Sequence, residues 1–296
     1  MKKIWAFLTS NRWLLIAILS FFIGLAIRFY YGLSTDLWGD EALSYFISQR
    51  NSYNDLFFST GDYLFLDHPP LYYVFLKIML ILNNADWWLR LTSLVWFFPS
   101  IYLVYKISSL FQNRNSTYLA ISLFSLHPLL INSAFQVRSY AMIIFLMLLT
   151  IYLVALNLKK PKLFRSFLIG ILLAVCFFTN YASVWLIAGL FFFMIYLFLS
   201  KRKLLAQNLL YSLCVFMVTG FFQIHVLVNH FLASKTQHLS FTHSVPFFNV
   251  SWIVYQLKML FGNDYWEFYI PLFLLINIFN LRKNKSLLTP LFFVCL

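Results

Sequence analysis

Charged residues are scarce in this chain. They make up 10% of its 296 residues, whereas hydrophobic residues make up 62%. A typical soluble domain has about a quarter of its residues charged, and it could not bury the apolar surface that this composition implies. Apolar runs recur along the whole chain, and each is long enough to cross a hydrocarbon core ~30 Å thick as a helix. The composition therefore excludes a soluble domain and indicates an integral membrane protein.

Regular alternation of polar and apolar residues is missing from these runs, and its absence excludes a transmembrane β-barrel. Lipid offers no partners to backbone N–H and C=O groups, so a span outside a barrel must be helical. We therefore predict an all-α, polytopic helical bundle with about 9–11 spans. We expect it to form a single domain over residues 1–296.

Cysteine is also rare. The three cysteines, Cys176, Cys214 and Cys295, all lie in apolar runs, so they suggest neither a disulfide framework nor a metal cluster. No tight group of His, Asp and Glu has the spacing of metal ligands. We therefore expect no metal and no other cofactor.

Acidic residues number nine against 22 basic ones, and the two kinds are separated along the chain. Six acids fall in residues 34–69, namely Asp36, Asp40, Glu41, Asp55, Asp62 and Asp67. Fifteen basic residues fall in short gaps between apolar runs: Lys2, Lys3, Arg12, Lys106, Arg114, Lys159, Lys160, Lys162, Arg165, Lys201, Arg202, Lys203, Arg282, Lys283 and Lys285. Such gaps are typical of cytoplasmic loops under the positive-inside rule, and this placement argues against nucleic-acid binding. We expect a multi-pass protein of the plasma (inner) membrane whose active site faces the periplasm or the exterior.

The acid-rich residues 34–69 are predicted to form an extracytoplasmic loop that carries the catalytic groups. Within it, apolar residues recur at helical spacing over residues 41–50, which predicts a short amphipathic helix in the membrane interface. Asp40 is placed to cap that helix. Pro69-Pro70 then begins the second span, since proline is tolerated in a first helical turn.

The number of crossings between His68 and Arg114 stays open, except that it must be odd if the two residues lie on opposite sides of the membrane. One solution uses residues 71–82 as a short crossing, followed by two crossings broken near Pro99. The other makes residues 71–82 re-entrant and residues 87–111 a single crossing. We prefer the first.

The two ends of the chain give further expectations. The first span is expected over residues 13–33, and a second outer loop over residues 229–262. Lys235 in that loop is either a phosphate ligand or a solvated residue. The last apolar run, residues 287–296, is too short to cross a membrane, so we expect the chain to be truncated at its C-terminus.

Four polar features converge on the predicted outer face: Asp40-Glu41, His68-Pro69-Pro70, Gln136-Val137-Arg138-Ser139-Tyr140 and Thr179-Asn180-Tyr181. A carboxylate in an interfacial loop can remove a proton from an acceptor hydroxyl. The guanidinium fork of an arginine can neutralise a phosphate, and a histidine can assist it. Together these features predict a reaction at the head group of a phosphorylated lipid.

Four motifs occur in order along the chain: Trp38-Gly39-Asp40-Glu41, Asp67-His68-Pro69-Pro70-Leu71-Tyr72-Tyr73, Arg90 and Gln136-x-Arg138-x-Tyr140. In order and spacing they resemble the GT-C membrane glycosyltransferases, and above all the relatives of protein O-mannosyltransferases and of the aminoarabinose transferases that modify lipid A. The resemblance covers residues 13–200.

The resemblance implies a glycosyltransferase that moves a sugar, with inversion, from a polyprenyl-phosphate donor to an acceptor outside the cytoplasm. It assigns Asp40 the role of base, and it assigns Glu41 a contact with the acceptor or a structural contact. His68 aligns with a basic position expected to contact the donor phosphate. Arg90 and Arg138 align with arginines expected near the donor or bracing the loop. Further substrate contacts are expected from Tyr72, Gln136, Tyr140 and Tyr181.

The chemistry of such a transfer places few demands on the protein. Phosphate is already a stable anion when it leaves, so the leaving group needs no general acid. The site must supply positive charge where negative charge grows, together with one base for the acceptor hydroxyl. A donor tethered in the bilayer adds positioning.

The chain also departs from the family pattern. Relatives often carry Thr-His-Tyr where this chain has Thr179-Asn180-Tyr181, so any role of that histidine is absent, and relatives continue well beyond residue 296. The sequence leaves the sugar (hexose or pentose) and the acceptor (lipid, polysaccharide or protein) open. Two alternatives are a secondary transporter, which would place ionisable groups near the membrane midplane in repeated halves, and a flippase-like membrane protein without transferase activity.

Overall fold

The computed structural model describes residues 11–50, 52–53, 56 and 69–236. The chain divides into two compact units, Met1–Gln223 and Ile224–Leu296, and all described helices except the end of the last one belong to the first unit. Over the described residues every regular element is a helix. The predicted all-α class is therefore confirmed.

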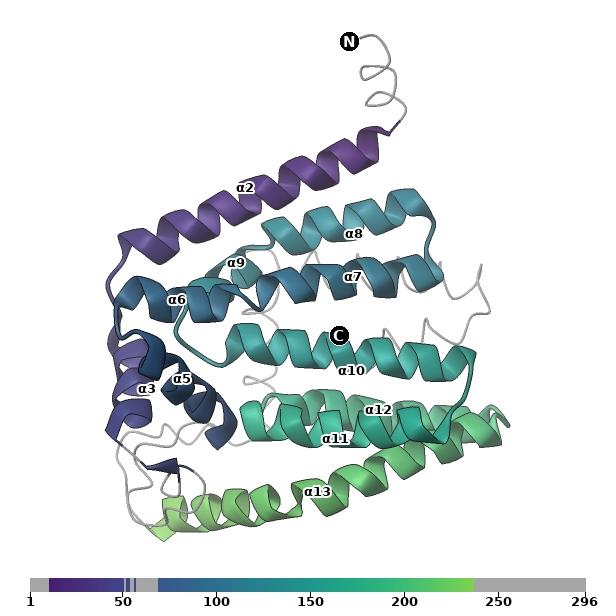
Figure 1. Cartoon of the computed structure of the whole chain (residues 1–296). Helices are drawn as coiled ribbons and strands as arrows, with labels where there is room; N and C mark the ends of the chain where they lie inside the picture. The colour runs from purple at the N-terminus through teal and green to yellow at the C-terminus, as the bar shows by residue number, and fades with distance from the viewer. Residues whose placement is uncertain (1–10, 51, 54–55, 57–68, 237–296) are drawn as a thin grey trace. The chain divides into compact units, whose positions relative to one another are not determined.

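The helices follow the apolar runs of the sequence. In chain order they are α2 (Arg12–Ser34), α3 (Gly39–Arg50), α5 (Pro70–Leu82), α6 (Asp86–Leu94), α7 (Phe97–Phe111), α8 (Arg114–Leu126), α9 (Pro128–Phe135), α10 (Tyr140–Lys159), α11 (Leu163–Thr179), α12 (Ser183–Leu199) and α13 (Lys203–Thr236). The longer helices of the first unit lie side by side, and the short helices α3 and α5 gather at one end of them (Figure 1).

Within the part of the chain that the structure describes, four helical segments are long and apolar enough to cross a membrane: Arg12–Ser34, Asp86–Phe111, Tyr140–Lys159 and Lys203–Phe221. The pair α8 and α9, which bends by 55° at its break, would make a fifth. Three shorter apolar helices, α5, α11 and α12, accompany them. The protein is thus a polytopic membrane protein, and the expected total of 9–11 spans remains a prediction.

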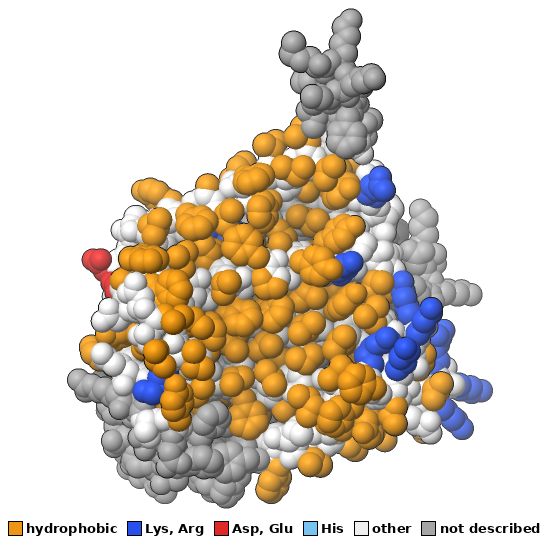
Figure 2. All heavy atoms as spheres, viewed as in Figure 1, with side chains coloured by type: hydrophobic (Ala, Val, Ile, Leu, Met, Phe, Trp, Pro, Cys, Tyr) orange, Lys and Arg blue, Asp and Glu red, His pale blue; other side chains and the backbone are white. Residues whose placement is uncertain are grey.

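The outward face of the first unit is apolar, as a lipid-facing surface requires. Large hydrophobic side chains such as Phe22 (60% exposed), Phe192 (61%) and Val218 (79%) point away from the protein, and hydrophobic side chains cover most of the visible face (Figure 2). In water such a continuous apolar surface would favour aggregation. In the hydrocarbon core of a membrane the same surface contacts lipid tails instead.

Charge is segregated between the two ends of the first unit. Lys and Arg side chains gather at the end formed by the α7–α8, α10–α11 and α12–α13 connections (Figures 1 and 2). The described acidic residues, Asp36, Asp40, Glu41 and Asp86, all lie at the opposite end, between α2 and α3 or at the starts of α3 and α6. This arrangement agrees with the charge separation predicted from sequence.

A close approach joins α2 to α8. Gly24 faces the end of α8 so closely that a Cβ there would overlap the backbone carbonyl oxygen of Ser125. One turn further on, the fully buried Arg28 donates a hydrogen bond to the same oxygen at 2.7 Å. Pro128, at the first position of α9, has no N–H with which α8 could continue. Helix α8 therefore ends before it, and the carbonyl oxygen of Ser125 lies in a last turn, where it has no partner within the helix. The Arg28 guanidinium supplies the donor to this oxygen.

The preferred interpretation of the segment after Pro70 is wrong. Helices α6 and α7 form one candidate span, Asp86–Phe111, interrupted only at Val95 and Trp96. Pro99 does not break the segment, because it lies in the first turn of α7, where a missing N–H is tolerated. The alternative, a single crossing preceded by the short helix α5, is the one that fits. Helix α5, at 13 residues, would be only ~20 Å long at ~1.5 Å per residue.

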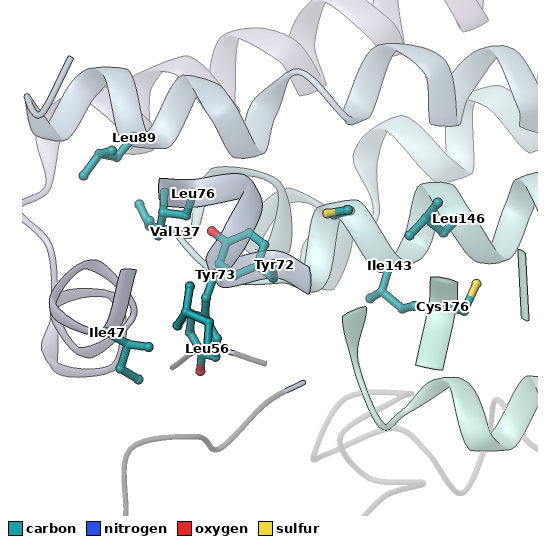
Figure 3. Close-up of a cluster of buried hydrophobic side chains, with 11 residues drawn as sticks. Ile47, Leu56, Tyr72, Tyr73, Leu76, Leu89, Val137, Ile143, Leu146 and Cys176 are labelled. Carbon is teal, nitrogen blue, oxygen red and sulfur yellow. The ribbon is translucent and has the colours of Figure 1, made fainter. Parts of the chain in front are cut away.

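A cluster of buried side chains connects α3 and α5 to the bundle. It contains Ile47 of α3, Tyr72, Tyr73 and Leu76 of α5, and Val137 of the α9–α10 connection (Figure 3). Tyr72 and Tyr73 point in different directions from α5, and Tyr73 lies beside Leu56 (Figure 3). The cluster fixes α3 and α5 to one end of the spanning helices.

The start of the predicted second outer loop, residue 229, lies within α13. That helix continues to Thr236, whereas its candidate membrane span covers Lys203–Phe221, so the expected start of the loop stays a prediction. The remainder of that loop, residues 237–262, and the final apolar run lie outside the described residues.

Candidate active site

The N-terminus of α3 carries two adjacent carboxylates. The helix begins at Gly39, which places Asp40 and Glu41 in its first turn. The Glu41 carboxylate accepts the backbone N–H of Trp38 at 3.1 Å, the reverse half of a capping box. The expectation that Asp40 caps the helix is therefore wrong, because Glu41, one residue later, reaches back to the uncapped N–H instead.

Glu41 and Arg90 form a buried ion pair. The Arg90 Nη2 atom lies 2.9 Å from Glu41 Oε2, and the side chains are 3% and 0% exposed. Arg90 also donates to the carbonyl oxygens of Asp36 at 2.7 Å and Phe135 at 3.4 Å. The other Glu41 oxygen accepts the backbone N–H of Val137 at 2.8 Å. These bonds connect the start of α3, the α2–α3 connection, α6 and the α9–α10 connection.

Asp40 and Arg138 form a second, more open pair beside the first. Arg138 Nη2 lies 3.6 Å from Asp40 Oδ2, and Arg138 Nη1 donates to the Asp40 carbonyl oxygen at 3.2 Å. The Asp40 side chain is 49% exposed. A charge-assisted hydrogen bond between an arginine and a carboxylate is ~2.7–2.9 Å long, so the side-chain contact is looser than that of Glu41. Two adjacent acids therefore meet two arginines in different ways, one closed and buried, the other open.

Arg138 stays cationic in this setting. Its guanidinium lies 5.7 Å from the centre of the Tyr140 ring. Burial opposes the charged form, but hydrogen bonding to Tyr140 and the charge of Asp40 outweigh it and raise the pKa of Arg138 above its ordinary value. Positive charge is thus permanently present beside the exposed carboxylate.

Asn180 fixes the segment that carries Arg138. Its side-chain amide donates to the Ser139 hydroxyl at 2.8 Å and accepts the backbone N–H of Ala182 at 2.8 Å. Asn180 is 5% exposed and Ser139 is fully buried. Asn180 therefore connects the α11–α12 turn to the start of α10.

The other predicted site residues are distributed unevenly. Tyr72 is buried in the core cluster at 1% exposure. Gln136 donates to Asn132 at 3.2 Å, and Tyr181 packs edge-on against Phe177 with ring centres 5.7 Å apart. His68 lies outside the described residues. Lys235 lies in α13, in a part of the helix whose side chains are not described.

Two further ionisable residues escaped the sequence reasoning, although both interrupt apolar runs. Arg28 is fully buried in α2, where its guanidinium stacks 4.0 Å from the centre of the Phe97 ring. Lys77 lies in α5 and contacts the end of α3. An ionisable residue inside an apolar run is a functional candidate by default, and this position in the sequence is the signal that could have identified both residues.

The remaining chemistry of the site concerns metals. Among the residues that the structure describes, no group of three His, Cys, Asp or Glu side chains is placed to hold a metal ion. Asp67 and His68 lie outside that part of the chain.

A family model described as dolichyl-phosphate-mannose-protein mannosyltransferase matches residues 67–226, which is more than half of the chain. The match includes Arg90, Arg138 and Asn180 and begins after Asp40 and Glu41. No curated protein and no solved structure matches the chain significantly.

Proposed function

The chain belongs to the dolichyl-phosphate-mannose-protein mannosyltransferase family of GT-C membrane glycosyltransferases, which use a lipid-linked sugar donor, and we propose that Asp40 is its catalytic base. The donor we propose is a polyprenyl-phosphate sugar, in keeping with the dolichyl phosphate of the family. The acceptor supplies a hydroxyl group, and the structure leaves its class open.

The proposed reaction is a single displacement at the anomeric carbon. Asp40 accepts the proton of the acceptor hydroxyl, whose oxygen forms the new bond to the sugar while the bond from the sugar to the phosphate oxygen breaks. The electron pair of that bond leaves with the polyprenyl phosphate. One displacement inverts the configuration at the anomeric carbon, and the acceptor and the phosphate lie on opposite faces of the sugar.

Arg138 is the proposed source of positive charge for this step. It carries a permanent charge next to Asp40, and its looser side-chain contact leaves the carboxylate half exposed. Positive charge placed where a phosphate gains negative charge is often the largest contribution to catalysis. His68, just before Pro69 and α5, is proposed as a second phosphate contact.

Glu41 and Arg90 are proposed to act as structural residues. Both are buried, and the oxygens of Glu41 are occupied by Arg90, Trp38 and Val137. A substrate could reach them only by breaking these bonds. Of the two functions that the resemblance allowed Glu41, the structural one is therefore favoured.

The orientation we propose places this site outside the cytoplasm. Basic connections gather at the opposite end of the bundle, and such loops remain cytoplasmic under the positive-inside rule. The membrane we propose is the plasma (inner) membrane, with the site facing the periplasm or the exterior.

The observation that carries the proposal is the difference between the two acid–arginine pairs. Of the two adjacent carboxylates at the start of α3, Glu41 is enclosed and saturated, whereas Asp40 is 49% exposed beside an arginine. Only Asp40 is therefore available to take a proton from a substrate.

The test is donor turnover in proteoliposomes that hold the full chain. The probe is a polyprenyl-phosphate mannose with radiolabelled mannose, supplied with a water-soluble acceptor, and release of label from the lipid phase reports transfer to that acceptor or to water. Asp40→Asn should lose ~10²–10⁴-fold in rate, the usual contribution of a general base. The matched control is Asp86→Asn, which removes an exposed carboxylate at the same end of the bundle and should retain the wild-type rate. Equal rates for wild type and Asp40→Asn would overturn the base assignment.

A further inference from the structure

Lys77 contacts the end of α3 that lies away from Asp40. Its Nζ atom donates to the carbonyl oxygens of Ser48 at 3.1 Å and Gln49 at 3.5 Å. Both carbonyls belong to the last turn of α3, which ends at Arg50. Carbonyl oxygens in a last turn have no partner within their helix, and a cation there also interacts favourably with the helix dipole.

Lys77 also contacts the chain just beyond that helix. Its ammonium group lies 5.6 Å from the centre of the Tyr53 ring. The three contacts of Lys77 therefore cover both the last turn of α3 and the residues that follow it. All three join α5 to one short segment of the first loop.

Helix α3 depends on α5 for its packing. Its buried apolar residue Ile47 belongs to the same cluster as Tyr73 and Leu76 of α5, and α5 is the helix that α3 mainly contacts. Lys77 follows Leu76 directly in α5, so the hydrogen bonds from Lys77 to α3 lie next to the apolar cluster that contains Leu76 and Ile47. Helix α3 is held at one end by Glu41 and Arg90, and at the other by Lys77.

We propose that Lys77 is a positioning residue for the transfer reaction, because its contact with the last turn of α3 sets the position of Asp40 relative to Arg138. This inference rests on the proposed role of Asp40 as the base. A helix of 12 residues is ~18 Å long at ~1.5 Å per residue. Movement at the Lys77 end therefore tilts α3 about Glu41 and turns the side chain of the neighbouring Asp40 relative to Arg138.

The same lysine connects the two motifs of the first loop. Helix α5 begins at Pro70, directly after the His68-Pro69 motif proposed to contact the donor phosphate. Helix α3 begins with the proposed base. Lys77 therefore joins the helix that begins with the proposed base to the helix that follows the His68-Pro69 motif in the chain.

The first test is kinetic. Lys77→Met keeps the length of the side chain but removes the charge, and it should lower the turnover number for polyprenyl-phosphate mannose by about tenfold or more, because small displacements of a reacting group are costly. The donor KM should stay within about twofold, since the donor itself is not contacted. Lys77→Arg should restore most of the rate. In the Asp40→Asn background, Lys77→Met should cause no further loss, because a residue that acts through Asp40 cannot act without it.

A matched control separates positioning from general stabilisation. Lys159 makes the same kind of contact at the basic end, where its Nζ donates to the Leu110 carbonyl in the last turn of α7 at 2.6 Å. Lys159→Met should keep the wild-type turnover number. If the two Lys→Met variants lower turnover equally, Lys77 has only a structural role and the proposal is overturned.

A distance measurement keeps the inference separate from the proposed function. Spin labels at Phe46 of α3 and Leu163 at the start of α11 are exposed and lie at opposite ends of the bundle. In a variant without the native cysteines, Lys77→Met should broaden or shift the distance distribution, and Lys77→Arg should not. An unchanged distribution overturns the positioning role whatever the activity. A shifted distribution in a chain without donor turnover supports the contact of Lys77 with α3 and overturns the proposed reaction instead.

Discussion

The carboxylate of Glu41 accepts the backbone N–H of Val137 at 2.8 Å, although the two residues are 96 positions apart. This bond holds the start of α3 against the connection between α9 and α10. Asp40 precedes Glu41 and Arg138 follows Val137, so one buried hydrogen bond brings the proposed base and its arginine together. The arrangement of the site therefore depends on Glu41, for which we propose a structural role.

Glu41→Ala should destabilise the protein more than any other single change at this end of the bundle. Removing one member of a buried ion pair typically costs ~3–5 kcal/mol, because the other charge is left unpaired. Thermal unfolding in detergent, followed by loss of monodisperse protein, measures the effect. Glu41→Gln is the matched control, since it keeps the size of the side chain and one acceptor oxygen, for Val137 or for Trp38, while removing the charge. An unfolding temperature for Glu41→Ala as high as that of Glu41→Gln would contradict the importance of the pair.

Arg138→Lys should lose as much turnover as Arg138→Gln. Arginine presents a planar fork that can contact the Asp40 backbone and a phosphate together, whereas a lysine offers a single charged point. Loss of one donor to a developing negative charge costs ~10²–10³-fold in turnover. Donor turnover at saturating polyprenyl-phosphate mannose measures it, and full activity of the lysine variant would show that charge alone is sufficient.

Gly24→Ala should destabilise the contact between α2 and α8. The new Cβ would overlap the Ser125 carbonyl oxygen, which is backbone and cannot rotate away. Overpacking of this kind costs ~1–3 kcal/mol. Gly32→Ala on the same helix is the control, because its Cβ would lie 3.5 Å from Phe135 Cβ, an ordinary contact. Unfolding temperatures that fall equally for the two variants would contradict the close approach.

Asn180→Ala should lower the rate of sugar transfer, because Asn180 holds the segment that carries Arg138. The change removes the hydrogen bonds to Ser139 and Ala182, and leaving a buried polar partner unsatisfied costs ~1–3 kcal/mol. Ser139→Ala should reproduce part of the loss, because it removes one of the same two bonds. Turnover and unfolding temperature measured together decide the outcome, and a wild-type result in both would exclude this connection.

Single cysteines at the two ends should react with a membrane-impermeant thiol reagent from opposite sides. Asn84→Cys lies at the acidic end and Lys160→Cys at the basic end, and both positions are exposed. In intact cells of a variant without native cysteines, position 84 should be labelled at once and position 160 only after the cells are opened. Labelling in the reverse order would refute the extracytoplasmic site.

The sequence predicted the elements that depend on local pattern. A long apolar run located α2, the helical spacing of residues 41–50 located α3, and Pro70 marked the start of α5. Each of these follows from composition within a single segment, so no knowledge of neighbouring helices was needed. The two site motifs that the family resemblance singled out, Asp40-Glu41 and Gln136–Tyr140, lie together at one end of the bundle.

The errors arose where tertiary context decides. Pro99 suggested a break, but its position in the first turn of α7 makes it harmless, and the interruption lies at Val95 and Trp96 instead. Both adjacent acids were possible caps from sequence alone, and only the geometry shows that Glu41 reaches Trp38. The contact of Lys77 with α3 joins two helices through a side chain, and neither helix carries a local signal for it.

The separation of acidic and basic ends has a further effect in an energised cell. With the orientation that we propose, the exposed carboxylate of Asp40 meets the external aqueous phase, whereas the basic connections lie on the cytoplasmic side. The proton that this base takes from the acceptor hydroxyl therefore passes to the outer phase. Sugar transfer thus adds its proton outside the cytoplasm, although no proton crosses the membrane through this protein.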